Sequence, residues 1–348
     1  MECESFFLKV PNSFNWKQQV EVIIMRLKLL IFLAVACAFV FASCSGESDE
    51  VSPDTAGTEQ CGASEEPIDE SPDAQATFRR TTLYYLSDEG FVVPVTKLIP
   101  WEDGIARACL TYMVSTPTNL SAAREMGLTT VIPDGVDIKL SIKDGNALVD
   151  ICNMSPLKSK ESEYAMIQSI VNTLTEFPTV STVTITRDGA GGKLENGTDL
   201  PVRQEKYPLN PDNEDIETSA GNRLITLYFP NLSGALTVPV THSISMEPNV
   251  YSVVSALVSG PKSSKLLNCF PKDTLLLGAT IENGVMTINL SEDFKSVAQT
   301  EGMFRLAYRT VWLTLSKQYD FDSLRFQVNG TDFCPEEPES TVINPFGK

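Results

Sequence analysis

Short motifs recur in the same order in the two halves of this 348-residue chain. The run TLYY at Thr82 returns as TLYF at Thr226, and VPVT at Val93 returns at Val238. Five further matches follow in step: V-S-x-P at Pro117 and Pro261, I/F-P at Pro133 and Pro271, D/N-G at Gly145 and Gly284, T-L at Leu174 and Leu315, and D/N-G at Gly189 and Gly330. This constant order indicates a duplication, so the chain must fold as two copies of one module.

The largest difference in length between the two copies lies at one place. Pro117 and Pro133 are 16 residues apart, whereas Pro261 and Pro271 are 10 residues apart. We therefore expect an insertion of six residues in the first copy, confined to the stretch between Pro117 and Pro133, with the same fold on either side of it.

Each copy contains the same series of expected elements. A first hairpin has its turn at Gly90 or Gly234. A helical segment follows, at 104–114 or 249–258, and a proline stops it. A second hairpin turns at Asp-Gly or Asn-Gly, the residues that a type I′ turn with two positive φ angles requires. A longer helix and a last strand, at 181–189 or 323–330, complete the copy.

Apolar residues three and four positions apart mark the buried face of the longer helix. They are Tyr164, Ile167, Ile170, Val171 and Leu174 in the first copy, and Phe304, Tyr308, Val311, Trp312 and Leu315 in the second. The aromatic stripe Phe304, Tyr308, Trp312 could instead form an exposed platform for a ligand. Its helical spacing among other apolar residues favours the core. No ligand is assigned to Trp101.

The expected fold class is α+β, with two tandem copies of a small, mainly antiparallel sheet that carries two helices on one face. The expected domains are residues 78–189 and 222–333. A linker at 190–221, rich in Gly, Pro, Asn and acids, joins them and can include ordered packing, although relative motion of the domains is the default expectation. Residues 334–348 form a tail.

An apolar run of fourteen residues, Leu29 to Ala42, follows the basic pair Arg26 and Lys28 and ends at Ala42-Ser43-Cys44. A helix of this length spans about 21 Å, which is too short for a hydrocarbon core of about 30 Å. The order of charge, short apolar run and small residues is typical of an export signal. We expect residues 1–43 to be a leader and lipoprotein signal peptide, in which residues 1–24 represent either an over-extended start or a long leader.

The cysteine that ends the run resembles the modified cysteine of a bacterial lipobox. This resemblance implies cleavage between Ser43 and Cys44, and attachment of a lipid to Cys44. The alternatives are a buried free Cys44 at the end of an uncleaved anchor helix, and processing at Cys37, where apolar residues continue. Residues 44–77, rich in acids, then form a lipidated, disordered tether.

A formal net charge of −18 argues against nucleic acid as a partner, because its phosphates would be repelled. The acidic surface of the chain would be repelled by anionic lipid headgroups as well, so the lipid on Cys44 must hold the chain at the membrane. The remaining cysteines show no C-x-x-C spacing, which argues against a zinc site. Buried thiols are expected at Cys109, Cys152 and Cys269.

No enzyme is expected, and no catalytic residue, metal ligand or cofactor is assigned. The single histidine, His242, is matched by Lys97 in the other copy, so it reads as a surface residue. The carboxylate pairs Glu161 with Glu163 and Glu292 with Asp293 read as solvated starts of helices, where acids favour the helix dipole. A peptidoglycan-associated binder or enzyme remains the alternative function.

The VPV hairpin, the V-S-x-P helix end, the entry to the D/N-G hairpin and the T-L helix before the last strand resemble the GerMN domain family. The resemblance covers residues 78–189 and 222–333. It implies a fold similar to the ring-building motif of secretion systems. It also implies a tandem lipoprotein of the cell envelope that acts as an assembly module in spore formation and germination.

The same resemblance places the protein on the extracytoplasmic face of the membrane, in the space between mother cell and forespore during sporulation. Its implied partners are envelope or sporulation channel proteins, with the membrane reached through Cys44 and peptidoglycan left open. A general envelope lipoprotein with no role in sporulation is the other reading of the same family.

Overall fold

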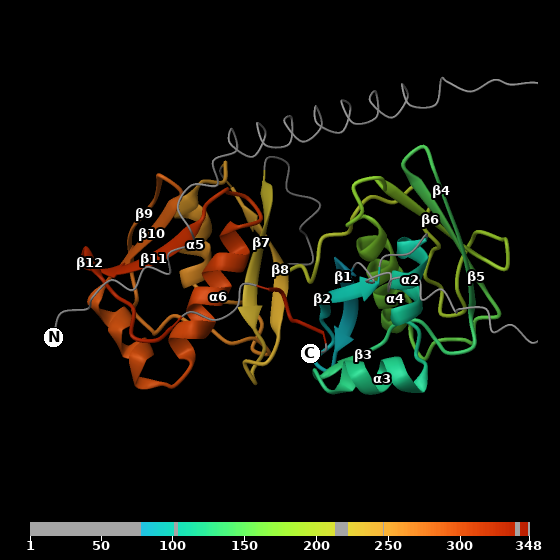
Figure 1. The fold of residues 1–348 in the computed structure, drawn as a ribbon, viewed down its shortest axis with the longest axis horizontal. Helices are drawn as coiled ribbons and strands as arrows, with labels where there is room; N and C mark the ends of the chain where they lie inside the picture. Colours follow the sequence, from blue (N-terminus) through green and yellow to red (C-terminus); the bar gives the residue numbers. More distant parts are fainter. Residues whose placement is uncertain (1–77, 101–103, 213–221, 246, 338–341, 347–348) are drawn as a thin grey trace, which may run out of the picture. The chain divides into compact units, whose positions relative to one another are not determined.

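A computed structural model describes residues 78–100, 104–212, 222–245, 247–337 and 342–346 (Figure 1). All of them belong to one compact unit of the chain, Pro72–Lys348. The expectations for the leader, the tether, Ser43, Cys44 and Trp101 lie outside the described residues.

The first copy is built from nine elements. They are β1 (Phe78–Ser87), β2 (Val92–Pro100), α2 (Ile105–Tyr112), α3 (Pro117–Arg124), β3 (Leu128–Thr129), β4 (Asp137–Lys143), β5 (Asn146–Cys152), α4 (Lys160–Leu174) and β6 (Thr182–Arg187). Hairpin, helix, hairpin, long helix and strand occur in the order that the sequence predicts.

The second copy repeats this series. Its elements are β7 (Arg223–Pro230), β8 (Thr237–Ile244), α5 (Val250–Val258), β9 (Leu276–Glu282), β10 (Val285–Leu290), the 3₁₀ helix η1 (Glu292–Gln299), α6 (Met303–Leu315), β11 (Ser323–Val328) and β12 (Thr331–Asp332). The α+β class is confirmed, as are the two copies of one order of elements.

The strands of each copy form two separate groups rather than a single sheet. In the second copy, β7 pairs only with β8 among the described strands, while β9 to β11 form a sheet with the short β12. Helices α5 and α6 lie between these two groups (Figure 1). The last strand is parallel to its neighbour, β11 to β10 and β6 to β5, because a helix carries the chain back to the start of the sheet.

The two predicted hairpin turns have the expected backbone. Asp144 and Gly145 have φ of 48° and 74°, and Asn283 and Gly284 have φ of 51° and 76°. Both central residues of each turn are therefore left-handed, which matches the right-handed twist of the flanking strands. These turns set the register in which β4 pairs with β5 and β9 pairs with β10.

The stretch between Pro117 and Pro133 of the first copy contains α3. The Thr116 side chain caps this helix by accepting a hydrogen bond from the Asn119 N–H at 3.2 Å, and Pro117 occupies its first turn. In the second copy, the described residues between Pro261 and Pro271 contain no helix. The extra residues of the first copy therefore lie where the sequence places them.

The long helices are buried on several sides, since strands lie on both sides of them. Ile167, Ile170, Val171 and Leu174 are buried as expected. Tyr164 is not: its side chain is 45% exposed, and its ring packs edge-on against Tyr207 at 5.8 Å between centroids. On α6, Phe304 is buried, whereas Tyr308 and Trp312 are half-buried and stack on each other.

The stretch expected to be a linker is folded over its described part. Its backbone forms bridges to the first copy, such as Val183 with Gln204, and Leu194, Leu200 and Leu209 are buried. The described part of the expected tail, residues 342–346, also packs into the molecule, with Phe346 buried. Hydrogen bonds and apolar contacts therefore hold both the linker and the tail against the folded copies.

Candidate interaction surface

The second copy carries an exposed groove between α5 and the edge strand β9, lined by both apolar and polar side chains. Tyr251 is 50% exposed, Leu275 62% and Leu277 48%. All three line one hollow of about 570 Å³, which Lys272 and Asp273 also line. Large apolar side chains gathered around a hollow are a feature of surfaces that bind partners.

The local sequence explains how this groove is built. Asn249 and Ser252 form a capping box that fixes the start of α5, so Tyr251 projects from its first turn. The Tyr251 hydroxyl then donates a hydrogen bond to the Leu276 carbonyl at 3.3 Å. This bond joins the helix to the edge of the sheet.

A bulge at the same place brings the Leu277 side chain to the surface. Leu290 pairs with Leu276 and the preceding Asn289 pairs with Gly278, so Leu277 is the extra residue. Strand β9 ends the sheet β12-β11-β10-β9, and one of its edges has no strand partner among the described residues. An open edge presents backbone N–H and C=O groups to an incoming strand.

The first copy has charged residues where this groove has apolar ones. When the copies are aligned on their shared prolines, Arg107 stands in place of Tyr251 and Asp137 in place of Leu275. These two exposed charges form an ion pair at 3.8 Å. The apolar side chains at these two positions therefore belong to the second copy, and duplication of the fold does not by itself account for them.

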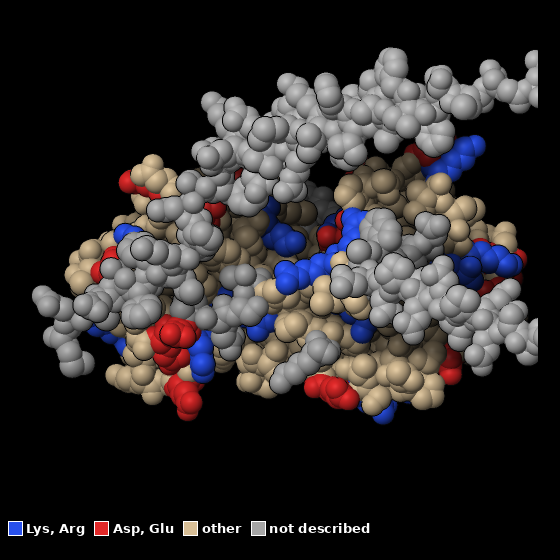
Figure 2. Space-filling view, viewed as in Figure 1, with Lys and Arg blue, Asp and Glu red and all other residues tan. Residues whose placement is uncertain are grey.

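Charged side chains are interspersed on the face of the molecule drawn in Figure 2. Lys and Arg as well as Asp and Glu are visible there, separated by broad areas of other residues. No helix among the described residues has the length and apolar character to cross a membrane. In the same residues no group of three or more His, Cys, Asp or Glu side chains is placed to hold a metal ion.

His242 is half-buried, which corrects the expectation of a plain surface residue. Its Nδ1 lies 2.5 Å from Asp212 Oδ2, and Lys262 Nζ lies 3.5 Å from the same oxygen. In the first copy, Lys97 occupies the corresponding place and its ammonium lies over the ring of Phe346 at 4.0 Å. In the second copy this position therefore contacts the linker, and in the first copy it contacts the tail, so its role in both is structural.

Glu163 also differs from its expected solvated state, because its side chain is fully buried. Its carboxylate accepts hydrogen bonds from the backbone N–H groups of Asn196 at 2.7 Å and Thr198 at 3.2 Å. Burial raises the pKa of this carboxyl, but the bonds from Asn196 and Thr198 together outweigh it and leave the pKa below its ordinary value. Glu292 and Asp293 are exposed in the first turn of η1, as expected.

The expectation of buried thiols is confirmed. Cys109, Cys152 and Cys269 are free and buried, whereas Cys334 is exposed. Burial raises the pKa of the Cys109 thiol to about 11 and that of Cys269 to about 12. A hydrogen bond to Asp150 raises the pKa of Cys152, because it stabilises the protonated thiol. Thiols in these states are poor nucleophiles at neutral pH.

Two stretches of the chain, residues 82–192 and 226–333, match the family Germane, which is described as "Sporulation and spore germination". The chain belongs to the Germane family. A relative, the spore germination protein GerM of Bacillus subtilis (strain 168), is 26% identical over 278 residues, which cover 76% of each chain. The resemblance to tandem GerMN proteins that the motifs indicated is thus confirmed.

A solved structure agrees with this assignment. The tandem GerMN domains of the sporulation protein GerM from Bacillus subtilis match with a TM-score of 0.61 and 24% identity, over 78% of this chain and 100% of that chain. The Germane chain therefore shares the fold of both domains in tandem.

Sequence reasoning did not find the groove of the second copy. The signal was present as the run Leu275-Leu276-Leu277, where the first copy has only Asp137-Ile138. A run of three apolar residues at the start of an edge strand places at least one of them on the solvent face. Comparing the copies for differences, as well as matches, would have revealed it.

Proposed function

We propose that this Germane protein is a membrane-anchored assembly module of the cell envelope, which binds other envelope proteins through the α5–β9 groove during spore formation and germination. The exposed cluster of Tyr251, Leu275 and Leu277 beside the open edge of β9 is the observation that carries the proposal. Membership of the family and similarity to GerM support the role in sporulation.

The partner that fits this groove is an extended segment with apolar side chains. Its backbone would pair with the open edge of β9, and its side chains would contact the Tyr251 ring and the leucines. Because the chain has a net charge of −18, partners with basic surfaces would approach faster than acidic ones. A channel complex between mother cell and forespore, as the family implies, is the proposed setting.

The lipid on Cys44 is the proposed anchor. The acidic residues that follow would act as a tether on the extracytoplasmic face, with a mean reach of about 30 Å for roughly thirty flexible residues. Two or more acyl chains hold a protein on a membrane stably without a spanning helix.

A photo-crosslinking amino acid placed at Leu277 in sporulating cells tests the groove directly. Leu148, an exposed residue of β5 that is 41% exposed, provides the matched control in the first copy. We expect a discrete crosslinked envelope protein from position 277 and none from position 148. The Leu277→Glu variant should reduce both the crosslink and sporulation, whereas Leu148→Glu should change neither.

The same experiment distinguishes the alternative functions. Equal crosslinking from both positions, or none from position 277, would contradict the groove as the binding surface. Incubation of the purified chain with peptidoglycan provides the second arm. Release of wall fragments that a single carboxylate substitution abolishes would replace the assembly module by an enzyme. Normal spore yield in a deletion strain would favour a general envelope lipoprotein.

A further inference from the structure

A short motif that lies outside the duplicated elements follows each copy. The first is Leu209-Asn210-Pro211 in the stretch after β6, and the second is Ile343-Asn344-Pro345. We call residues 209–212 the first Asn-Pro segment and residues 343–346 the second. Sequence reasoning placed the first in the linker and the second in the tail, and gave neither a role.

Each segment pairs through its backbone with a strand of the other copy. In the second segment, the Ile343 carbonyl accepts a hydrogen bond from Thr96 N at 2.9 Å, and Phe346 N donates to the Thr96 carbonyl at 3.0 Å. Thr96 lies on β2 of the first copy. In the first segment, Leu209 O and Asp212 N make the same two bonds with Thr241 on β8, at 2.8 Å and 3.1 Å. Thr241 is the counterpart of Thr96 in the VPVT motif.

The two asparagines bridge β2 and β8 in the same way. Asn344 donates from Nδ2 to the carbonyls of Pro94 at 2.9 Å and Thr237 at 2.8 Å, and its Oδ1 accepts from Thr237 N at 2.9 Å. Asn210 donates from Nδ2 to the carbonyls of Val92 and Pro239, and its Oδ1 accepts from Val92 N. One side-chain amide thus joins a strand of each copy.

The proline of each VPVT motif explains why an asparagine is required. Pro94 and Pro239 have no N–H, so β2 and β8 cannot satisfy each other's carbonyls at these positions with a continuous ladder. An asparagine amide supplies two donors and one acceptor in a fixed plane. An aspartate of the same shape would place a carboxylate against carbonyl oxygens and would lack both donors.

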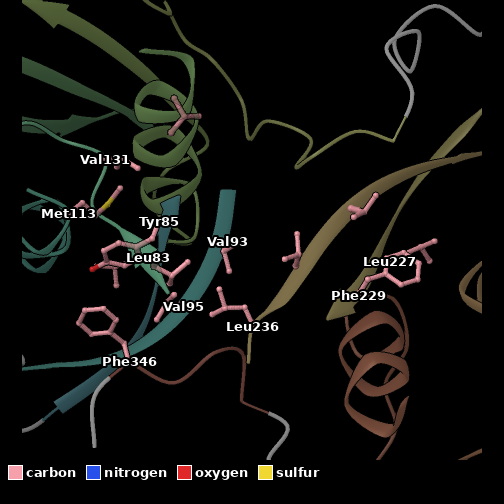
Figure 3. Close-up of a cluster of buried hydrophobic side chains, with 14 of the residues drawn as sticks. Leu83, Tyr85, Val93, Val95, Met113, Val131, Leu227, Phe229, Leu236 and Phe346 are labelled. Carbon is pink, nitrogen blue, oxygen red and sulfur yellow. The ribbon is translucent and has the colours of Figure 1, made fainter. Parts of the chain in front are cut away.

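The residue after the Asn-Pro pair distinguishes the two segments. Phe346 is buried and stacks on Tyr85, with ring centroids 5.3 Å apart and planes at 12°. Figure 3 shows its ring beside Val95 and near Tyr85, with Leu236 facing Val93 across the gap between the strands. In the first segment, Asp212 takes the corresponding place and contacts His242. An aromatic residue therefore suits the β2 side and an acid suits the β8 side.

We propose that the adjacent edges of β2 and β8 form a recognition groove for an extended aliphatic-Asn-Pro-aromatic peptide, and that two copies of this chain exchange their second Asn-Pro segments through it. Two segments that lie far apart along the chain make the same backbone hydrogen bonds and the same three asparagine bonds to β2 and β8, so this part of the recognition depends on the motif and not on how the segment is joined. Identical contacts form whether the segment comes from the same chain or from a second one. Only the effective concentration of the attached segment favours the internal arrangement.

A labelled peptide with the sequence of residues 341–348, TVINPFGK, tests the groove by fluorescence anisotropy. We expect saturable binding to a chain that lacks residues 342–348, and binding at least about tenfold weaker to the unmodified chain, whose groove is filled. The peptide with Asn344→Asp should bind the shortened chain at least about tenfold less tightly. Equal binding of the two peptides, or no binding to a shortened chain that melts cooperatively, would overturn the proposal.

A full-length variant covers the case in which the shortened chain does not fold. Asn344→Asp keeps every other residue and weakens only the chain's own segment, so this variant should bind the unmodified peptide. Failure to bind in a variant with an unchanged circular dichroism spectrum would refute the groove. For exchange between chains, two differently tagged unmodified chains are warmed together and cooled. Mixed pairs should form, and excess TVINPFGK peptide should suppress them, whereas mixed pairs that the peptide leaves unchanged would refute exchange.

Discussion

The hydroxyl of Thr314, on α6, accepts a hydrogen bond from the backbone N–H of Tyr228, on β7, at 3.0 Å. In the first copy, Thr173 on α4 makes the same contact with Tyr84 N on β1 at 3.2 Å. Both threonines are buried, and each is the Thr of the repeated T-L pair. The T-L pair therefore recurs because a buried backbone N–H of the strand needs a hydrogen-bond acceptor, and the helix that covers the strand provides it.

Replacing Thr314 by Val should destabilise the chain by about 1–3 kcal/mol, because the shape is kept while a buried N–H loses its partner. Thr314→Ser, which retains the hydroxyl, serves as the control and should cost clearly less. Urea unfolding followed by circular dichroism gives both values. A valine variant as stable as the serine variant would show that this hydrogen bond contributes little.

The stability of the chain should depend on pH through Glu163. The pKa of this carboxyl is lowered in the folded state, so its ionised form stabilises the fold above its ordinary pKa, and that contribution is lost as the pH falls through the folded-state value. Glu163→Gln should therefore lower the free energy of unfolding at pH 7, by about 1–3 kcal/mol for the weakened buried hydrogen bonds.

The difference between the wild-type chain and Glu163→Gln should shrink as the pH falls below about 4. The exposed neighbour Glu161 provides the control, and Glu161→Gln should have a much smaller effect at pH 7. Urea titrations at several pH values make the comparison. A Glu163→Gln penalty that stays constant from pH 7 down to pH 3 would contradict the assignment of charge to this site.

Much of the fold could be predicted because its determinants are local. The Asp144-Gly145 and Asn283-Gly284 turns need positive φ at two successive residues, and few residue pairs other than these adopt it readily. The insertion that holds α3 was visible as a difference in proline spacing. The burial of Tyr164 was predicted wrongly because helical periodicity only identifies the face of the helix that a residue lies on. How far Tyr164 is covered depends on a neighbour outside the helix, Tyr207, which contacts only one side of its ring.

The interaction surface and the Asn-Pro segments could not be predicted in the same way. The exposure of Leu277 depends on a bulge, which periodicity within one copy does not indicate. The role of Asn344 depends on Pro94, a residue 250 positions away. Propensity and periodicity describe neighbours along the chain, whereas these contacts follow from the tertiary arrangement.

The described cysteines should differ sharply in reactivity. Cys334 is exposed, whereas burial raises the pKa of Cys109 and Cys269, and Asp150 raises that of Cys152. Brief treatment of the native chain with iodoacetamide at pH 7.5 should therefore modify Cys334 and leave the other three largely intact, as mass spectrometry of tryptic peptides can measure. Treatment in urea is the control and should modify all four. Modification of Cys269 as fast as Cys334 in the native chain would contradict its burial.

Cys44 is expected to carry the lipid that anchors the protein. The apolar run before it is too short to span a bilayer and ends in small residues, and the chain turns polar directly after it at Ser45-Gly46-Glu47. Cys44→Ala should therefore block lipid attachment and processing, so that the protein keeps residues before position 44 and its mass rises accordingly. Cys37→Ala is the matched control and should leave mass and membrane fractionation unchanged. A Cys44→Ala protein with the mass and membrane content of the wild type would exclude this lipid site, and the reverse pattern would move it to Cys37.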